Sequence, residues 1–172
     1  MRRGEVLGLR WQDMDLKKGR LAVTQQLKVV RSKLVIEPPK SKRSRRTIKI
    51  PAPVVAELER HRKDQLEQRL RLGVGGRPEL VFTTPTGEMI NPDTLSDAFK
   101  RMASAIKPVT FHCLRHTHIT HLLKAGVPVH IVSARAGHAK PSITLDIYSH
   151  LLGGEDNDAS IQAEALLLRV LK

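Results

Sequence analysis

The chain has 172 residues, 40% of them hydrophobic, which suits a single domain that buries roughly 70% of its unfolded surface. Its formal net charge of +13 at pH 7 predicts a polyanionic partner, most simply nucleic acid. Apolar runs fall short of the ~20 residues needed to cross a bilayer, a signal peptide is not evident, and a single cysteine, Cys113, excludes an internal disulfide. We therefore expect a cytoplasmic protein with no membrane partner.

The N-terminal part of the chain predicts a short helix followed by strands. Residues 2–9 are typical of the end of a helix. Apolar residues then recur with a β pattern in four segments, at 21–23, 27–30, 34–36 and 47–50. From these segments we predict a small three-stranded antiparallel sheet near residues 20–50.

Helical spacing dominates the rest of the chain. Pro51 and Pro53 suit the start of a helix at 53–71, and Thr110 could cap another at 111–124. Residues 80–82 are typical of a short strand. Further helices are predicted at 91–105, 128–135, 142–151 and 158–171. The predicted fold class is therefore α+β, mainly α-helical.

One face of the helix predicted at 111–124 carries an arginine between two histidines. His112, Arg115 and His116 share this face because they are three and four residues apart. Zinc is a poor match, since the glutamate of a zinc-protease motif is missing and Arg115 would repel a cation. An oxyanion fits better, because guanidinium donates paired hydrogen bonds and imidazole exchanges protons near neutral pH. Solvated histidines at a helix N-terminus are an equally simple interpretation of these three residues alone.

A dense run of positive charge occupies residues 40–49. A solvated face or a targeting signal is the usual explanation of such a run. Here the run borders a β pattern and follows two prolines, which favours contacts with a phosphate backbone. Its members are Lys40, Lys42, Arg43, Arg45, Arg46 and Lys49.

Tyr148 is the only tyrosine in the chain. A phenol has an unperturbed pKa of about 10, so a nucleophilic role at neutral pH requires nearby cations or a base. Gly137 lets the backbone turn before His138, although a glycine after a helix is a weak signal alone. A tyrosine packed by chance in a core is the alternative. The histidines and arginines upstream favour a nucleophile aimed at a DNA phosphate.

Together these motifs resemble the catalytic domain of the tyrosine recombinases, the family of phage-type site-specific integrases. The resemblance covers nearly the whole chain and depends on the order and spacing of its segments more than on any one of them. The segments are Arg2-x-x-Glu5 with 7–15, then 40–48, 81–84, 111–117, 136–138 and 144–150.

The resemblance implies a role for each residue that would touch the phosphate. Tyr148 would attack it, leaving a 3′-phosphotyrosyl bond and a free 5′-hydroxyl. Arg2 and Arg115 would clamp the nonbridging oxygens and stabilise the transition state. Lys40 would be the general acid for the departing 5′-oxygen.

The resemblance also assigns the histidines. His112 would exchange the tyrosine proton, and His138 would donate a hydrogen bond to the phosphate. Glu5 and His116 would support the other groups from behind. Because the phosphotyrosyl bond stores the energy of the broken strand, and two arginines supply positive charge, no cofactor and no metal are expected.

By the same resemblance, residues 1–172 are a catalytic domain that lacks its first helix and the family's N-terminal core-binding domain. The expected partner is double-stranded DNA, on which the full-length protein would form a tetramer, in the cytoplasm of a prokaryote and associated with its nucleoid. Two alternatives remain open: an enzyme like the type IB topoisomerases, and a mobile-element integrase remnant that binds DNA without cleaving it. The residues expected to contact DNA are Lys42, Arg43, Arg45 and Arg46.

Overall fold

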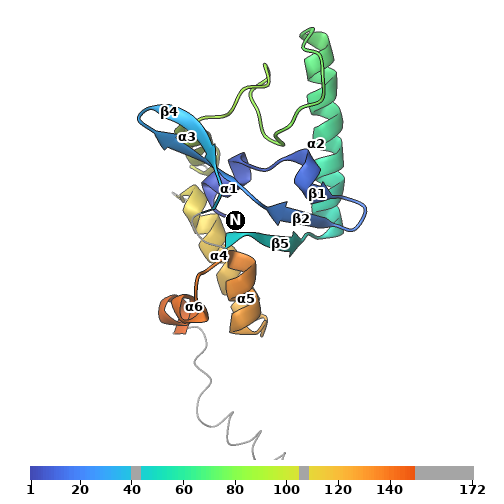
Figure 1. Ribbon diagram of the computed structural model, residues 1–172. Helices are drawn as coiled ribbons and strands as arrows, with labels where there is room; N and C mark the ends of the chain where they lie inside the picture. The colour runs from blue at the N-terminus through green and yellow to red at the C-terminus, as the bar shows by residue number, and fades with distance from the viewer. Residues whose placement is uncertain (40–43, 105–108, 150–172) are drawn as a thin grey trace, which may run out of the picture.

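The computed structural model describes residues 1–39, 44–104 and 109–149 (Figure 1). The chain begins with a short helix and a single 3₁₀ turn, and five strands follow. In chain order these elements are α1 (Arg3–Leu7), η1 (Trp11–Asp13), β1 (Met14–Asp15), β2 (Arg20–Val23), β3 (Gln26–Val30), β4 (Lys33–Glu37) and β5 (Arg46–Lys49).

The strands form two antiparallel sheets. In the three-stranded sheet β2 lies in the middle, with Leu21 opposite Met14 of β1 on one side and Ile48 of β5 on the other. Strands β3 and β4 form a separate two-stranded sheet, and Arg31 and Ser32, which both have positive φ, close the tight two-residue hairpin between them. A small three-stranded antiparallel sheet is therefore present, as predicted, and the β3–β4 hairpin forms a second sheet in addition to the predicted one.

Five helices make up the rest of the described chain. They begin and end close to the predicted positions, and α2 starts directly after Pro51. The segment 80–82 makes only an isolated bridge, between Leu80 and Arg10, instead of the predicted strand. The helix predicted at 158–171 lies outside the described residues. The helices are α2 (Ala52–Arg71), α3 (Pro92–Ala103), α4 (Phe111–Lys124), α5 (Val129–Ala136) and α6 (Pro141–Tyr148).

Two apolar clusters hold these elements together. The first lies against the three-stranded sheet, where the indole Nε1 of Trp11 donates a 2.9 Å hydrogen bond to Gln65 of α2. The second lies among α4, α5 and α6 and contains Ile119, Val132 and Tyr148. Tyr148 is therefore fixed by the packing of three helices.

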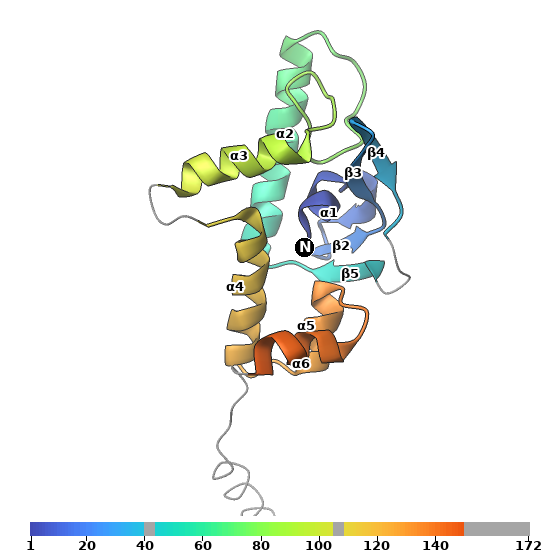
Figure 2. The same cartoon turned by 90° about the vertical axis from the view of Figure 1, so that its left-hand side faces the viewer.

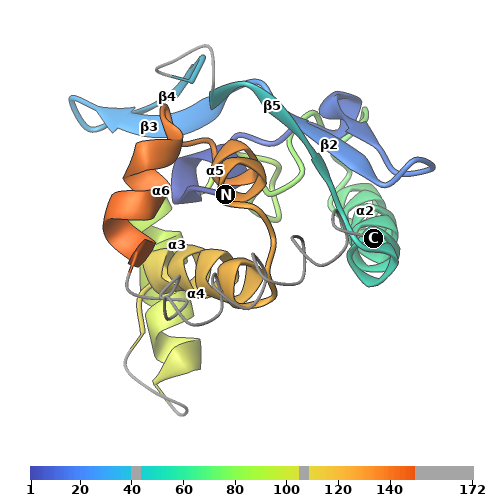
Figure 3. The same ribbon diagram turned by 90° about the horizontal axis from the view of Figure 1, so that it is seen from below.

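The strands form one layer, and α3, α4, α5 and α6 lie on one side of it (Figure 3). Helices α5 and α6 lie at the opposite end of the domain from the tip of α2 (Figure 2). The short helix α1 lies in the middle of the molecule, between the strands and α4. None of the described helices is long and apolar enough to cross a membrane.

Candidate active site

A pocket of about 570 Å³ opens where α1, α4, the α5–α6 connection and α6 meet. Residues from the two ends of the described chain meet in it: Arg2 and Glu5 from the start of α1, and His138 and Tyr148 from the C-terminal part. Seven of the residues predicted to act on the phosphate, or to support those that do, line its wall: Arg2, Glu5, His112, Arg115, His116, His138 and Tyr148.

Tyr148 is the last residue of α6, and only 4% of it is exposed. Its hydroxyl forms a 2.5 Å hydrogen bond with Nδ1 of His116, and the two ring centroids lie 5.4 Å apart. Burial raises the pKa of the Tyr148 phenol, and the positive charge of Arg115 opposes that rise. The phenol therefore keeps its proton at neutral pH until a base removes it.

His112 lies one helical turn before His116 and packs edge-on against it, with ring centroids 5.3 Å apart. Burial, followed by the positive charges of His116 and Arg115, lowers the pKa of His112. The resemblance to tyrosine recombinases assigned the exchange of the tyrosine proton to His112. In the structure His116 lies between His112 and the hydroxyl of Tyr148.

Arg115 of α4 is only 7% exposed, and its guanidinium group faces the same pocket. Both terminal nitrogens, Nη1 and Nη2, are buried without a hydrogen-bond partner among the described residues. Burial, followed by the charge of Arg2, lowers the pKa of Arg115 to about 10. A buried cation without an anion is costly, so this group is arranged to receive one from outside.

His138 enters the pocket through a turn at Gly137, which ends α5 with a left-handed φ of 75°. Nδ1 of His138 lies 2.7 Å from the hydroxyl of Thr144. When that hydroxyl donates to Nδ1, the imidazole carries its proton on Nε2 and donates it to an oxyanion. Burial, followed by the charges of Arg115 and Arg2, lowers the pKa of His138 to about 4, so the ring is neutral at pH 7.

Thr144 is a site residue that the sequence analysis did not assign. It is fully buried at 0% exposure and holds the ring of His138 from behind. Its position, four residues before Tyr148 on the same helix, was the available signal, since residues at this spacing share a face. The two side chains therefore act from one side of α6.

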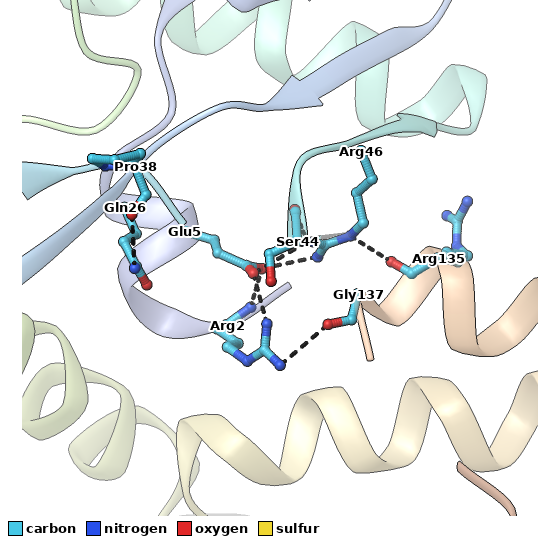
Figure 4. Close-up of polar contacts among 8 residues, drawn as sticks. All are labelled: Arg2, Glu5, Gln26, Pro38, Ser44, Arg46, Arg135 and Gly137. Carbon is cyan, nitrogen blue, oxygen red and sulfur yellow. Dashed lines mark hydrogen bonds and ion pairs between the residues drawn. The ribbon is translucent and has the colours of Figure 1, made fainter. Parts of the chain in front are cut away.

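Glu5 holds Arg2 in place at the start of α1 (Figure 4). Its carboxylate accepts the backbone N–H of Arg2 at 2.7 Å and Nη1 at 3.1 Å, while Nη2 of Arg2 donates to the carbonyl of Gly137 at 3.3 Å. Burial alone would raise the pKa of Glu5, but hydrogen bonds from Arg46 and Arg2 outweigh it and lower the pKa to about 2. Glu5 is thus an ionised carboxylate that orients Arg2 toward the pocket.

Arg46 points into the domain, with a side chain that is 7% exposed. It donates to the two carboxylate oxygens of Glu5 at 2.9 and 3.1 Å, and its Nε donates to the carbonyl of Arg135 at 2.9 Å (Figure 4). From the charge run we expected a DNA contact at Arg46. The structure instead uses it to join β5, α1 and the end of α5.

The other members of the charge run have different places. Arg45, which precedes β5, is exposed. Lys40, Lys42 and Arg43 lie outside the described residues. Across residues 1–39, 44–104 and 109–149, no group of three or more histidine, cysteine, aspartate or glutamate side chains could hold a metal ion.

Residues 1–154 match the profile of the phage integrase family. The chain is 34% identical over 174 residues to the tyrosine recombinase XerC-like protein of Caldanaerobacter subterraneus subsp. tengcongensis, and 33% identical over 154 residues to tyrosine recombinase XerC 2 of Ralstonia nicotianae. These alignments cover 92% and 88% of this chain. They cover 44% and 39% of the relatives, so the chain spans less than half the length of these curated proteins.

Solved structures with the same fold include the Tn1549 transposon integrase in complex with transposon right end DNA. Its TM-score is 0.77 at 22% identity, over 97% of this chain and 55% of that one. The XerH site-specific recombinase bound to a palindromic difH substrate gives a TM-score of 0.58 at 22% identity, over 93% of this chain and 41% of that one. These likenesses confirm the predicted α+β, mainly helical fold.

Proposed function

The chain belongs to the phage integrase family of tyrosine recombinases, and we propose that it is the catalytic domain of a site-specific recombinase that breaks and rejoins DNA strands. The observation that carries this proposal is the buried guanidinium of Arg115, whose two terminal nitrogens lack partners among the described residues. They face the pocket that the hydroxyl of Tyr148 also lines. A phosphate diester supplies the missing anion and places its phosphorus next to the nucleophile.

In the proposed reaction, the hydroxyl oxygen of Tyr148 attacks phosphorus and loses its proton as the bond to the 5′-oxygen breaks. Arg2 and Arg115 stabilise the charge that develops on the nonbridging oxygens, and His138 donates to one of them. The departing 5′-oxygen takes a proton from Lys40. Rejoining reverses these steps with a 5′-hydroxyl, so the energy of the phosphodiester bond is kept in the phosphotyrosyl bond.

The proposed partner is double-stranded DNA, bound through the basic run that includes Lys42, Arg43 and Arg45. The net charge of +13 supports this choice. Two solved relatives are described as DNA complexes, which supports it further. For the full-length protein we propose a tetramer on DNA, in the cytoplasm where prokaryotic DNA lies. The reaction it serves would be integration, excision, inversion or dimer resolution of DNA.

Covalent capture tests the proposal directly. The protein is incubated with a pool of nicked duplexes of random sequence. Where the nick lies close to the cleavage site, the short fragment that carries the free 5′-hydroxyl diffuses away, rejoining is prevented and the adduct is trapped. Wild type should form an adduct that survives SDS, and sequencing the captured DNA gives the site. Tyr148→Phe should form none while binding DNA with nearly unchanged affinity.

A DNA-binding remnant gives a different result. Its binding constant for DNA falls steeply with salt: each neutralised phosphate lowers the logarithm of the constant by about 0.9 for a tenfold rise in salt concentration. Neither wild type nor Tyr148→Phe forms an adduct, however. Equal adduct formation by both proteins would refute Tyr148 as the nucleophile. A binding constant that does not change with salt would refute DNA as the partner.

A further inference from the structure

Tyr148 needs a base, and the structure places one in contact with its reacting atom. Nδ1 of His116 is 2.5 Å from the hydroxyl oxygen of Tyr148, within the range of a hydrogen bond between a nucleophile and its base. His116 directly follows Arg115 on α4, so the helix that binds the phosphate also carries the base.

We propose that His116 is a catalytic residue that accepts the proton of Tyr148 during strand cleavage and returns it during rejoining. This inference rests on the proposed function, in which Tyr148 is the nucleophile. As the bond from the tyrosine oxygen to phosphorus forms, the phenol proton moves to Nδ1 of His116 and the bond to the 5′-oxygen breaks. A separate acid protonates the 5′-oxygen, so His116 serves only the tyrosine side of the reaction.

This direction of transfer requires one tautomer of His116. To accept a proton at Nδ1, a neutral imidazole carries its own proton on Nε2. His116 is an exposed residue, so solvent stabilises the imidazolium charge until the proton returns to Tyr148. The titratable and charged groups of the pocket around this contact are Arg2 and Glu5 at the start of α1, His112 and Arg115 from α4, His138 after α5 and Tyr148 from α6.

The other two histidines of the pocket have different positions. Nδ1 of His138 is engaged with Thr144, and burial lowers its pKa to about 4, which makes it a poor proton acceptor. His112 reaches the phenol only through His116, against whose ring it packs. The contacts therefore favour His116 as the base for Tyr148, in place of His112, to which the resemblance assigns this role.

The first test measures the cleavage rate as a function of pH on the duplex recovered by covalent capture. His116→Asn keeps a polar atom at the position of Nδ1 but cannot take up a proton, so its rate should fall about 100-fold or more. A plot of the wild-type cleavage rate against pH should have a rising limb, as expected for catalysis by a base, and His116→Asn should lose this limb. His121→Asn, an exposed histidine on the same helix, is the matched control and should retain both rate and limb.

A second substrate distinguishes a base from an acid. When sulfur replaces the scissile 5′-oxygen, the leaving group departs as a thiolate and needs no acid. The defect of His116→Asn should persist on this substrate, because the tyrosine proton must still be removed. Recovery of the wild-type rate would overturn the proposal by placing His116 on the leaving group. Loss of the pH limb in His112→Asn but not in His116→Asn would also overturn it.

A third measurement needs neither DNA nor activity. Because Tyr148 is the only tyrosine, growth on 3-fluorotyrosine labels the nucleophile alone for fluorine NMR. At a fixed pH, the fluorine signals of folded His116→Asn and His116→Gln should differ from that of wild type, because the hydrogen bond between Tyr148 and Nδ1 of His116 is lost, while His121→Asn should leave the signal unchanged. An unchanged signal in a folded His116 variant would refute the contact even where wild type forms the adduct. An intact contact without any adduct overturns the proposed function, and with it the catalytic role.

Discussion

Replacing Glu5 with glutamine should destabilise the domain by about 3 kcal/mol at pH 7. The folded protein lowers the pKa of Glu5 from 4.5 to about 2, and each pKa unit is worth about 1.4 kcal/mol. The same magnitude follows independently from the buried ion pair, since removing one partner leaves Arg46 buried and unpaired at a cost of about 3–5 kcal/mol. Because the folded pKa is depressed, this stability is present above pH 4.5 and disappears as the pH falls toward 2.

Urea unfolding followed by the fluorescence of Trp11, the only tryptophan and 8% exposed, measures the change. The difference between wild type and Glu5→Gln should be about 3 kcal/mol at pH 7 and about half of that or less at pH 3. Glu57→Gln, on the surface of α2 with a side chain that is 67% exposed, should change stability by less than about 0.5 kcal/mol. A loss under 1 kcal/mol for Glu5→Gln at pH 7, or an equal loss at both pH values, would refute the ion-pair reasoning.

Three further substitutions test the site. Arg115→Met should stabilise the DNA-free domain by roughly 1–3 kcal/mol in calorimetry, because it removes a buried cation without partners among the described residues, and should lower adduct formation by about 100-fold or more. Gly137→Ala should destabilise more than Gly126→Ala in urea: both glycines have a φ of 75°, but a Cβ at position 137 would lie 2.6 Å from the guanidinium of the β5 arginine, whereas position 126 has nothing within 4 Å. Thr144→Val should slow cleavage by about 10-fold, because His138 loses the hydroxyl that holds Nδ1 at 2.7 Å, and Thr144→Ser should restore the rate.

The order of the helices could be predicted because their signals are local. Pro51 and Pro53 mark the start of α2, and Gly73, which has a φ of 67°, marks its end. Pairing between strands depends instead on residues far apart in the chain. Residues 80–82 have the composition of a strand, yet Val81 donates its N–H to Leu9 beside an irregular turn, so no regular ladder forms there.

The site also combines features that local sequence predicts with features that depend on contacts between distant parts of the chain. Spacing along α4 placed His112 and His116 on one face, but only the packing of α6 determines which of them meets Tyr148. Successive residues of a strand point to opposite faces, and for this reason the side chain of Arg46 at the start of β5 is buried while Lys49 at its end is exposed. The sequence shows that this segment is basic, but the pairing of β5 determines which of its basic side chains are exposed.

The pocket concentrates positive charge that the DNA-free domain has to accommodate. Burial, and then the neighbouring cations, lower the pKa of Arg115 to about 10 and that of His138 to about 4. Glu5 balances Arg2 and Arg46, which leaves Arg115 as the buried guanidinium without a partner among the described residues. In the proposed reaction, a phosphate that gains charge in its transition state would meet donors that are already oriented. The free energy that the domain gives up by burying Arg115 unpaired would then be recovered, in part, when that phosphate binds.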